Sequence, residues 1–369
     1  MLYKTPARGW NSWNTFCADI NEKLIMEMAD VIVSEGYKDA GYEYVIIDDC
    51  WSLKERVDGK LVADPALFPH GMKALSDYIH GRGLKFGMYS CAGFKTCAGY
   101  PSSYGHEFED AKQFAEWGVD YLKYDFCNFP ASGDAKNAYL TMAMALRNSG
   151  REIFFAACNW GVQDPAKWMR SRGANSYRST GDIFDVPKSY KDIFMQQCEN
   201  IEGNAVGCYN DMDMLIVGMH GNGNVGIGGC TDEQYLQHFA MWAFLGSPLI
   251  IGSDIRNIDE VNKATLLNKG LIAINQDSAN CPATARSLPL TGAEYLWVSW
   301  SMDKMTEKCC KECGRRLTKD EIALHKKLYN RAAESFLCIK CSSGYLGVTE
   351  EMLAAKIEEF KRMGCTLFD

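Results

Sequence analysis

The sequence predicts a (β/α)8 TIM barrel, followed by a short β hairpin and a small, cysteine-rich, mostly helical tail. Apolar β-rich runs alternate with amphipathic stretches up to about residue 277. Strands that alternate with helices of ten or more residues indicate βαβ units and a parallel sheet. Eight such units favour a closed barrel, which needs roughly 250 residues. The 369-residue chain is therefore long enough for the barrel and a further small part.

The predicted strands are short and apolar, and several end in polar residues. They cover Ala7–Asn11, Tyr42–Asp49, Lys85–Ser90, Tyr121–Asp125, Ile153–Cys158, Ser176–Thr180, Cys208–Leu215 and Pro248–Asp254. The predicted helices cover Glu22–Ala40, Gly71–Arg82, Glu107–Trp117, Ala135–Ser149, Pro187–Asn200, Asp232–Leu245 and Asp259–Asn268. No GxGxxG motif follows the first strand, which weighs against a dinucleotide-binding sheet.

Three parts are expected along the chain: a barrel over residues 1–280, a β hairpin or linker over 281–304, and a tail over 305–369. Arg286–Ser301 has the pattern of a single hairpin. Its two faces are both apolar, so we expect either a neighbouring subunit or a helix of the tail to cover it. From Met305 onward the composition changes to paired cysteines and a slightly basic charge.

Composition excludes several classes of protein. The hydrophobic content of 47% is ample for a large core, and the formal net charge of −8 argues against nucleic-acid binding. No apolar run is long enough for a transmembrane helix, so we expect no membrane partner. The first residues carry no basic segment followed by an apolar run, so we expect no signal peptide and a cytoplasmic location.

Polar side chains gather at the predicted C-terminal ends of the strands, where barrels of this kind carry their chemistry. These residues are Trp13, Asp48, Asp49, Tyr89, Lys123, Asp125, Asn159, Trp160, Arg178, Asp182, Asp211 and Asp213. A single Asp after a strand is usually a helix cap or a turn residue, and the aromatics could belong to the core. Six acids on one rim would nevertheless repel one another unless a cation or a polyhydroxyl ligand lay among them. Aromatics beside acids fit a sugar site.

Two of these acids suit the two roles that glycoside hydrolysis requires. Retaining enzymes use one carboxylate as nucleophile and a second carboxyl group as general acid and base. Lys123 lies two residues before Asp125 on the same strand, so both point to one face and the ammonium keeps the carboxylate ionised. Asp182 lies in a loop after the sixth strand, where it can act as acid and base. Arg178 can neutralise the resting site and bind a hydroxyl.

In order and spacing, the strand ends resemble glycoside hydrolase family 27, which contains α-galactosidases and α-N-acetylgalactosaminidases. The matching segments span residues 6 to 277. They are Gly9–Asn14, Asp48–Trp51, Lys95–Gly99, Trp117–Asp125, Tyr177–Asp182, Asn210–Leu215 and Ala273–Asp277.

The resemblance implies a barrel that hydrolyses terminal α-galactosides with Asp125 as nucleophile and Asp182 as acid/base, and without a catalytic cofactor. It implies oligosaccharide or glycoconjugate substrates. The remaining implied substrate-binding residues are Trp13, Asp48, Asp49, Tyr89, Lys123, Trp160, Arg178 and Asp213. Of these, Asp48 and Asp49 resemble the pair that binds O4 and O6, Lys123 the O3/O4 ligand, and Arg178 the residue that contacts O2. It also implies disulfides Cys17–Cys50 and Cys97–Cys127.

Two departures from the family pattern matter. Asn159 stands where many galactosidases have Glu, and it can hydrogen-bond a 2-hydroxyl as donor and acceptor. Galactose is the favoured substrate sugar, with N-acetylgalactosamine or a β-L-arabinopyranoside as alternatives. The family's chains usually end in a β-sandwich, whereas here only one apparent hairpin precedes Met305 and the tail does not resemble that sandwich. The sequence leaves the oligomeric state open, a homo-oligomer included.

The tail carries the pattern of a structural zinc site. Cys310-x₂-Cys313 and Cys338-x₂-Cys341 are separated by 24 residues, and two such pairs typically hold one zinc with four thiolates. Two disulfides or a redox motif are the alternatives. Thr318–Ser335 and Thr349–Met363 have helical patterns, the first with a capping box and the second with one apolar face.

Two other classes of function remain open. The barrel could bind sugar without turnover, or the chain could be an adaptor that acts through its zinc tail. Turnover of an aryl α-galactoside separates the enzyme from both.

Overall fold

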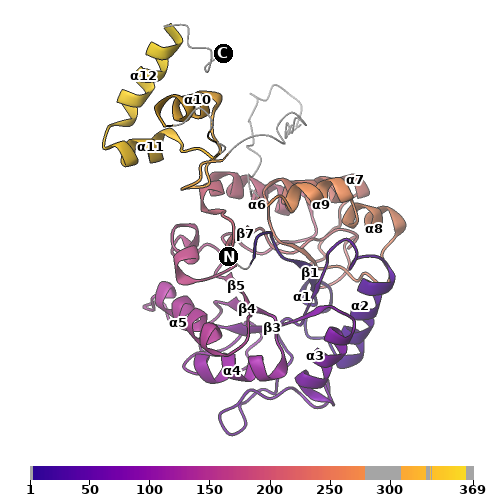
Figure 1. Cartoon of the computed structure of the whole chain (residues 1–369). Coiled ribbons are helices and arrows are strands. Elements are labelled where there is room, and N and C mark those ends of the chain that lie inside the picture. The colour runs from indigo at the N-terminus through magenta and orange to yellow at the C-terminus, as the bar shows by residue number, and fades with distance from the viewer. Residues whose placement is uncertain (1–2, 279–308, 330–332, 334, 363–369) are drawn as a thin grey trace. The chain divides into compact units, whose positions relative to one another are not determined.

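The computed structural model describes residues 3–278, 309–329, 333 and 335–362. The chain divides into two compact units, Met1–Ser278 and Ala279–Asp369 (Figure 1). The expected hairpin over 281–304 lies outside the described residues. In the part of the chain that is described, no helix is long and apolar enough to cross a membrane.

The first unit is the predicted barrel of eight parallel strands. Its strands are β1 (Arg8–Asn11), β2 (Tyr44–Ile46), β3 (Lys85–Cys91), β4 (Tyr121–Asp125), β5 (Phe154–Cys158), β6 (Ser176–Arg178), β7 (Tyr209–Asp211) and β8 (Leu249–Ile251). They lie in the order β7-β6-β5-β4-β3-β2-β1-β8. A parallel bridge between Leu215 and Ile251 joins the segment after β7 to β8. This contact closes the sheet on itself.

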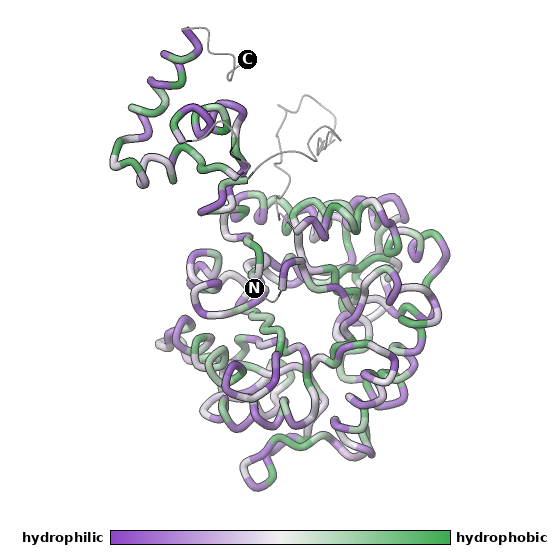
Figure 2. Tube along the Cα trace, in the orientation of Figure 1, coloured by the Kyte–Doolittle hydropathy of each residue, from purple (hydrophilic) through white to green (hydrophobic). Residues whose placement is uncertain are grey.

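Helices surround the strands, and along them hydrophobic and hydrophilic residues alternate (Figure 2). They are α1 (Trp13–Phe16), α2 (Glu22–Ser34), α3 (Gly71–Gly81), α4 (Glu107–Trp117), α5 (Ala135–Asn148), α6 (Pro187–Glu199), α7 (Asp232–Phe244), α8 (Glu260–Leu266) and α9 (Lys269–Asn275). Short polar side chains fix several starts: Asn21 caps α2, Asp134 caps α5 and Thr231 forms a capping box on α7.

Stacked aromatic rings fill the interior of the barrel. Tyr121 and Phe154 lie parallel with ring centroids 5.0 Å apart, and Tyr44 packs against both. These rings and Ile46 belong to one buried cluster. Because the interior is solid, a ligand can enter only at the open ends of the strands.

The observed elements match the predicted ones closely, with shorter strands at several places. The predicted second strand, Tyr42–Asp49, is a regular strand only over Tyr44–Ile46. The predicted helix Glu22–Ala40 ends at Ser34, and a turn around Gly36, which has φ +83°, follows it. A left-handed residue at that point cannot continue a helix.

The second unit contains three described helices: α10 (Lys319–Leu328), α11 (Ile339–Leu346) and α12 (Glu350–Arg362). Thr318 and Glu321 form the predicted capping box on α10. The predicted helix Thr318–Ser335 is too long, since α10 ends at Leu328, and α11 was not predicted. Cys338 caps α11, because its sulfur atom accepts the N–H of Cys341.

The apolar face of α12 has a partner within its own unit. Leu353 and Ile357 are buried in a cluster with Leu324 of α10, and Phe360 packs against the same cluster. This face therefore has a partner within its own unit, while what covers the hairpin over 281–304 stays a prediction, because that segment lies outside the described residues. A unit this small needs the face for its own core.

The close packing of β1 against β2 yields a stability prediction. A methyl group at Gly9 would lie 2.4 Å from the carbonyl oxygen of Tyr44, and that backbone cannot move without shifting the sheet. We expect Gly9→Ala to lower the free energy of unfolding of the barrel by about 1–3 kcal/mol. Gly81→Ala is the control, because a methyl group there meets nothing within 4 Å. Thermal unfolding that is equal for Gly9→Ala and the wild-type protein would contradict this prediction.

Candidate active site

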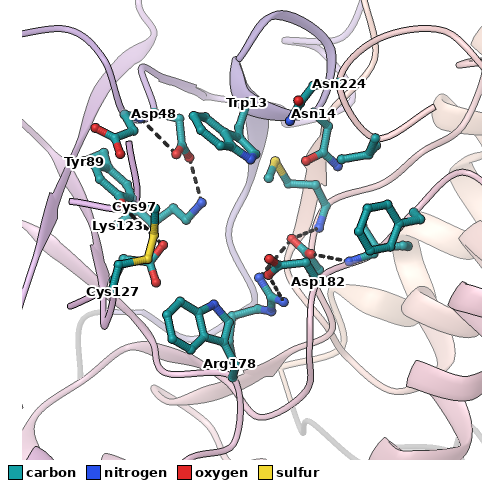
Figure 3. A pocket seen from close by; sticks show the side chains of 18 residues that line it. Trp13, Asn14, Asp48, Tyr89, Cys97, Lys123, Cys127, Arg178, Asp182 and Asn224 are labelled. Carbon is teal, nitrogen blue, oxygen red and sulfur yellow. Dashed lines mark hydrogen bonds and ion pairs between the residues drawn. A yellow bond between two sulfur atoms is a disulfide. The ribbon is translucent and has the colours of Figure 1, made fainter. Parts of the chain in front are cut away.

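A cavity of about 360 Å³ opens at the C-terminal ends of the strands. Its lining comprises Trp13, Asn14, Asp48, Asp49, Tyr89, Cys97, Lys123, Asp125, Cys127, Trp160, Arg178, Asp182, Ile183, Phe184, Asp213, Met214, Asn224 and Val225. Figure 3 shows two charged groups that face each other across the cavity, Asp48 with Lys123 on one side and Arg178 with Asp182 on the other.

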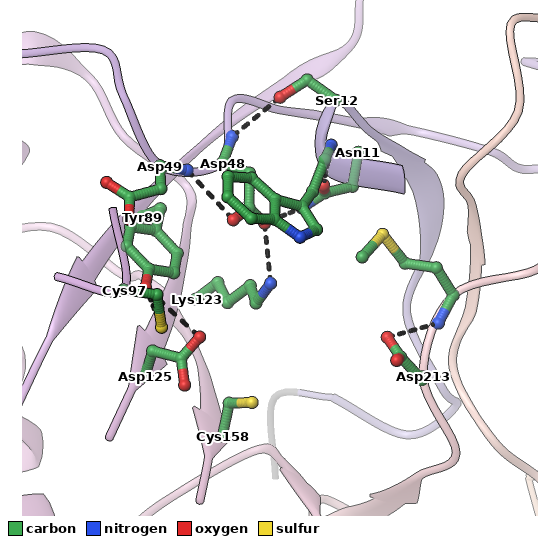
Figure 4. Close-up of polar contacts among 12 residues, drawn as sticks. Asn11, Ser12, Asp48, Asp49, Tyr89, Cys97, Lys123, Asp125, Cys158 and Asp213 are labelled. Carbon is green, nitrogen blue, oxygen red and sulfur yellow. Dashed lines mark hydrogen bonds and ion pairs between the residues drawn. The ribbon is translucent and has the colours of Figure 1, made fainter. Parts of the chain in front are cut away.

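The first group lies on β2, β4 and the segments that follow them. Lys123 Nζ donates to Asp48 Oδ2 at 2.8 Å, and Asn11 Nδ2 donates to the same oxygen at 2.8 Å (Figure 4). Burial alone would lower the pKa of Lys123, but the charges of Asp48 and Asp125 outweigh it and hold that pKa above its usual range. The ammonium therefore stays charged although it is largely buried.

Asp49 is fixed by backbone donors. Its carboxylate accepts from the N–H of Cys50 at 2.7 Å and from the N–H of Ala98 at 2.9 Å. Burial nevertheless raises its pKa. Asp48 and Asp49 thus follow β2 as two neighbouring carboxylates with different surroundings, and both line the cavity.

Asp125 lies at the end of β4, where its side chain is buried beside the cavity. Tyr89 OH donates to its Oδ2 at 3.3 Å, and the N–H of Phe126 donates to its Oδ1 at 2.9 Å. Burial raises the pKa of Asp125 to about 6, against the opposing effects of the Lys123 charge and the Phe126 N–H. These hydrogen bonds fix the orientation of the carboxylate. Its pKa of about 6 leaves it ionised at neutral pH.

Arg178 on β6 organises the opposite side. Its guanidinium lies 3.0 Å from Asp182 Oδ1 and 3.2 Å from Asp213 Oδ1. Asp213 is buried and accepts the N–H of Ile183 at 2.8 Å, whereas the side chain of Asp182 is 62% exposed. A buried Arg–Asp pair thus supports an accessible carboxyl group at the mouth of the cavity.

Most of the residues selected from the sequence meet in this cavity, and Asn159 and Asp211 are the exceptions. Asn159 is fully buried and is absent from the described lining. Its Nδ2 donates to the carbonyl of Val162 at 2.7 Å. The expected contact with a 2-hydroxyl is therefore not supported. The following residue, Trp160, turns into the lining with φ +53°. Asp211 lines a smaller neighbouring cavity instead.

Sequence reasoning missed several lining residues. Asn14 and Phe184 lie close in sequence to Trp13 and Asp182, which were predicted to line the site. This closeness was the available signal for including them. Asn224 comes from the glycine-rich loop before α7, where no pattern pointed to the site. It reaches the cavity because its N–H bonds the carbonyl of Thr15 at 3.2 Å.

Of the two disulfides implied by the resemblance, one is present. Cys97 and Cys127 are bonded to each other, and both line the cavity. Cys17 and Cys50 are free thiols, so the second pairing is not formed in this structure. The bonded pair joins the loops after β3 and β4 beside Asp125.

The second unit brings its two cysteine pairs together. Backbone bridges pair Cys309 with Arg316 and Cys310 with Phe336, which places the two turns side by side. The sulfur atoms of Cys310, Cys313, Cys338 and Cys341 all lie within 4.8 Å of one another. The Sγ atoms of Cys313 and Cys338 are 3.7 Å apart.

Known proteins resemble the first unit throughout. Residues 5–277 match the family profile described as Alpha galactosidase A. The chain is 49% identical to alpha-galactosidase 2 of Arabidopsis thaliana over 75% of this chain and 68% of that protein. It is 39% identical to alpha-galactosidase A of Cellvibrio japonicus over 96% of this chain and 90% of that protein.

Solved structures of α-galactosidases also resemble this chain. The α-galactosidase of Saccharomyces cerevisiae in its raffinose complex has a TM-score of 0.71 and 40% identity, covering 76% of this chain and 66% of that one. A β-L-arabinopyranosidase of Geobacillus stearothermophilus, 24% identical with a TM-score of 0.66 over 74% of this chain and 77% of that one, shows the fold alone. The chain thus spans about two thirds of the length of the Arabidopsis and yeast proteins. With the barrel, the paired carboxyls and these similarities in place, the chain belongs to the α-galactosidase family of glycoside hydrolases.

Proposed function

We propose that the chain hydrolyses terminal α-galactosides with retention of configuration. The observation that carries this is the placement of two carboxyl groups of unlike surroundings in one cavity, buried Asp125 and exposed Asp182. Double displacement needs one carboxylate that attacks and one carboxyl group that exchanges protons with the leaving group and with water.

Asp125 suits the attack on the anomeric carbon. Its oxygens are held by Tyr89 and by the N–H of Phe126, so the carboxylate is oriented before the substrate arrives. Lys123 lies on the same strand and stabilises its negative charge. Attack forms a bond from the carboxylate to the anomeric carbon and releases the leaving-group oxygen.

Asp182 suits the proton transfers. Its exposed side chain lies at the mouth of the cavity, where the leaving group departs and where water enters. It protonates the departing oxygen in the first step and removes a proton from the attacking water in the second. Between these steps Arg178 stabilises the carboxylate form of Asp182, because its guanidinium lies 3.0 Å from Asp182 Oδ1.

The remaining polar groups suit a galactose ring. The oxygens of Asp48 and Asp49 and the ammonium of Lys123 form one wall of the cavity, where they can accept from and donate to neighbouring hydroxyls. Trp13 offers an apolar ring face. The raffinose bound to the similar yeast enzyme supports an oligosaccharide substrate. Since Asn159 is turned away, N-acetylgalactosamine remains the alternative to test beside galactose.

We further propose that the second unit binds one structural zinc ion. Four thiolates at about 2.3 Å from zinc in a tetrahedron lie about 3.8 Å from one another. The 3.7 Å between Cys313 and Cys338 matches that edge, and all four sulfurs lie within 4.8 Å. The metal would hold together a unit whose hydrophobic clusters are small.

Removal of the acid/base group provides the test of mechanism. We expect Asp182→Ala to lower kcat/KM on an α-linked disaccharide by about 100-fold or more. The first step on an aryl α-galactoside is partly spared, because its leaving group departs without a proton. Azide should restore turnover of the aryl substrate and give an α-linked galactosyl azide, identified by NMR.

Two outcomes would contradict this assignment: equal losses of first-step rate on both substrates, or a β-linked azide. The wild-type protein is assayed in parallel on aryl α-galactoside and aryl α-N-acetylgalactosaminide. Turnover of neither would reject the proposed activity, and a preference for the second would reassign the sugar.

The raised pKa of Asp125 predicts the acidic side of the pH profile. The nucleophile must be ionised, and its pKa is raised to about 6 by burial. On the acidic side of the profile, activity should therefore fall as the pH drops through about 6, when Asp125 takes up a proton. The measurement is kcat/KM on an aryl α-galactoside between pH 4 and pH 8. A profile that stays flat down to pH 4.5 would contradict it.

The cysteine cluster predicts the metal content of the protein. Protein prepared without chelators should contain about one zinc per chain by elemental analysis. Replacement of Cys338 and Cys341 by Ser should remove the metal. Cys198→Ser, a change of a free thiol in the barrel, should retain it. Absence of zinc from the wild-type protein would refute the site, as would full zinc content in the double variant.

A further inference from the structure

The segment that carries Asp182 also presents an aromatic ring to the cavity. Exposure alternates along residues 182–185: Ile183 and Asp185 are fully buried, whereas the Asp182 side chain is 62% exposed and Phe184 is 43% exposed. Asp182, Ile183 and Phe184 all line the cavity, and of the three Asp182 and Phe184 are the exposed ones.

The backbone around this ring is held on the side away from the cavity. The N–H of Phe184 donates to Ser189 Oγ at 2.9 Å. The carboxylate of Asp185 accepts from Tyr235 OH at 2.9 Å and from the N–H of Gly221 at 2.6 Å. The backbone that carries the ring is therefore fixed before any ligand binds, so a contact with the ring costs little ordering of the main chain.

The position of the ring defines what it can touch. A proton donor must lie within hydrogen-bond reach of the glycosidic oxygen, so the leaving group lies beside Asp182 while the galactose lies deeper, between Asp125 and Asp48. An exposed phenyl ring two residues from Asp182, in the lining of the same cavity, therefore meets the leaving group rather than the galactose. Single exposed apolar residues are common on protein surfaces, but Phe184 lies in the wall of the cavity.

We propose that Phe184 forms the leaving-group subsite of this enzyme. Its ring packs on the apolar face of a cyclic leaving group, either a pyranose or an aryl ring, that is attached at the glycosidic oxygen or one methylene away. The preferred substrates are then α-galactosides with such a ring, rather than those with a small acyclic leaving group. The inference rests on the proposed activity and names the substrate class of the same site.

The reaction sequence separates this role from a general structural one. All α-galactosides give the same covalent intermediate at Asp125, so contacts with the leaving group act only before it departs. Loss of the ring should lower kcat/KM of substrates with a cyclic leaving group. It should not alter binding of free galactose, which reaches only the deeper part of the cavity.

The experiment compares melibiose, whose leaving group is a glucose ring, with methyl α-galactoside, whose leaving group is methanol. We expect Phe184→Ala to lower kcat/KM for melibiose about tenfold more than for methyl α-galactoside. Phe184→Tyr keeps the ring and should keep the wild-type ratio. Phe94→Ala is the matched control: Phe94 is 59% exposed but is not part of the described cavity lining, so both substrates should be unaffected.

Equal losses on the two substrates, or no loss on melibiose, would overturn the leaving-group subsite. A weakened inhibition by free galactose in Phe184→Ala would also overturn it, since the ring would then act on the deeper part of the cavity. Failure of the proposed activity looks different, because the wild-type protein would then turn over neither substrate.

Discussion

Two buried cations allow the acids of the barrel rim to share one cavity. Carboxylates taken out of water in a group repel one another and would take up protons. Lys123 lies 2.8 Å from Asp48, and Arg178 lies 3.2 Å from Asp213, so each side of the cavity holds its own counter-charge. Both cations come from strands, β4 and β6, whose backbone the barrel fixes. The geometry of the site depends on these two pairs.

The unlike surroundings of the two reacting carboxyls follow from where the chain places them. Asp125 ends a strand, so it is held by the strand's own continuation and lies deep among buried groups. Asp182 lies in a loop beyond the end of β6, so its carboxyl group reaches the mouth of the cavity. Arg178 forms an ion pair with this carboxyl group. The same loop position brings Phe184 to the cavity wall. One short segment thus carries both the proposed proton donor and the ring proposed to contact the departing group.

The two units owe their order to different physical sources. The barrel is large enough to bury a continuous core of stacked aromatic rings and aliphatic side chains. The second unit has only small clusters around Leu324 and Phe336. The zinc ion proposed for the cysteine cluster would offset the entropy of ordering such a short chain, since the hydrophobic clusters of its described residues are small.

The sequence by itself determined the barrel, the two carboxyls and the cysteine cluster. Strand and helix periodicity is local, and residues at the ends of parallel strands meet at one edge whatever the details of packing. Trp160 lines the cavity as the sequence predicted, but only the tertiary structure decided that Asn159 bonds Val162 and stays out of the described lining. It also decided that Asn224 and Phe184 join the cavity, that Cys17 and Cys50 are not bonded to each other, and that α12 packs on α10. These outcomes depend on loop conformation and on contacts between residues far apart in the chain, which no local pattern encodes.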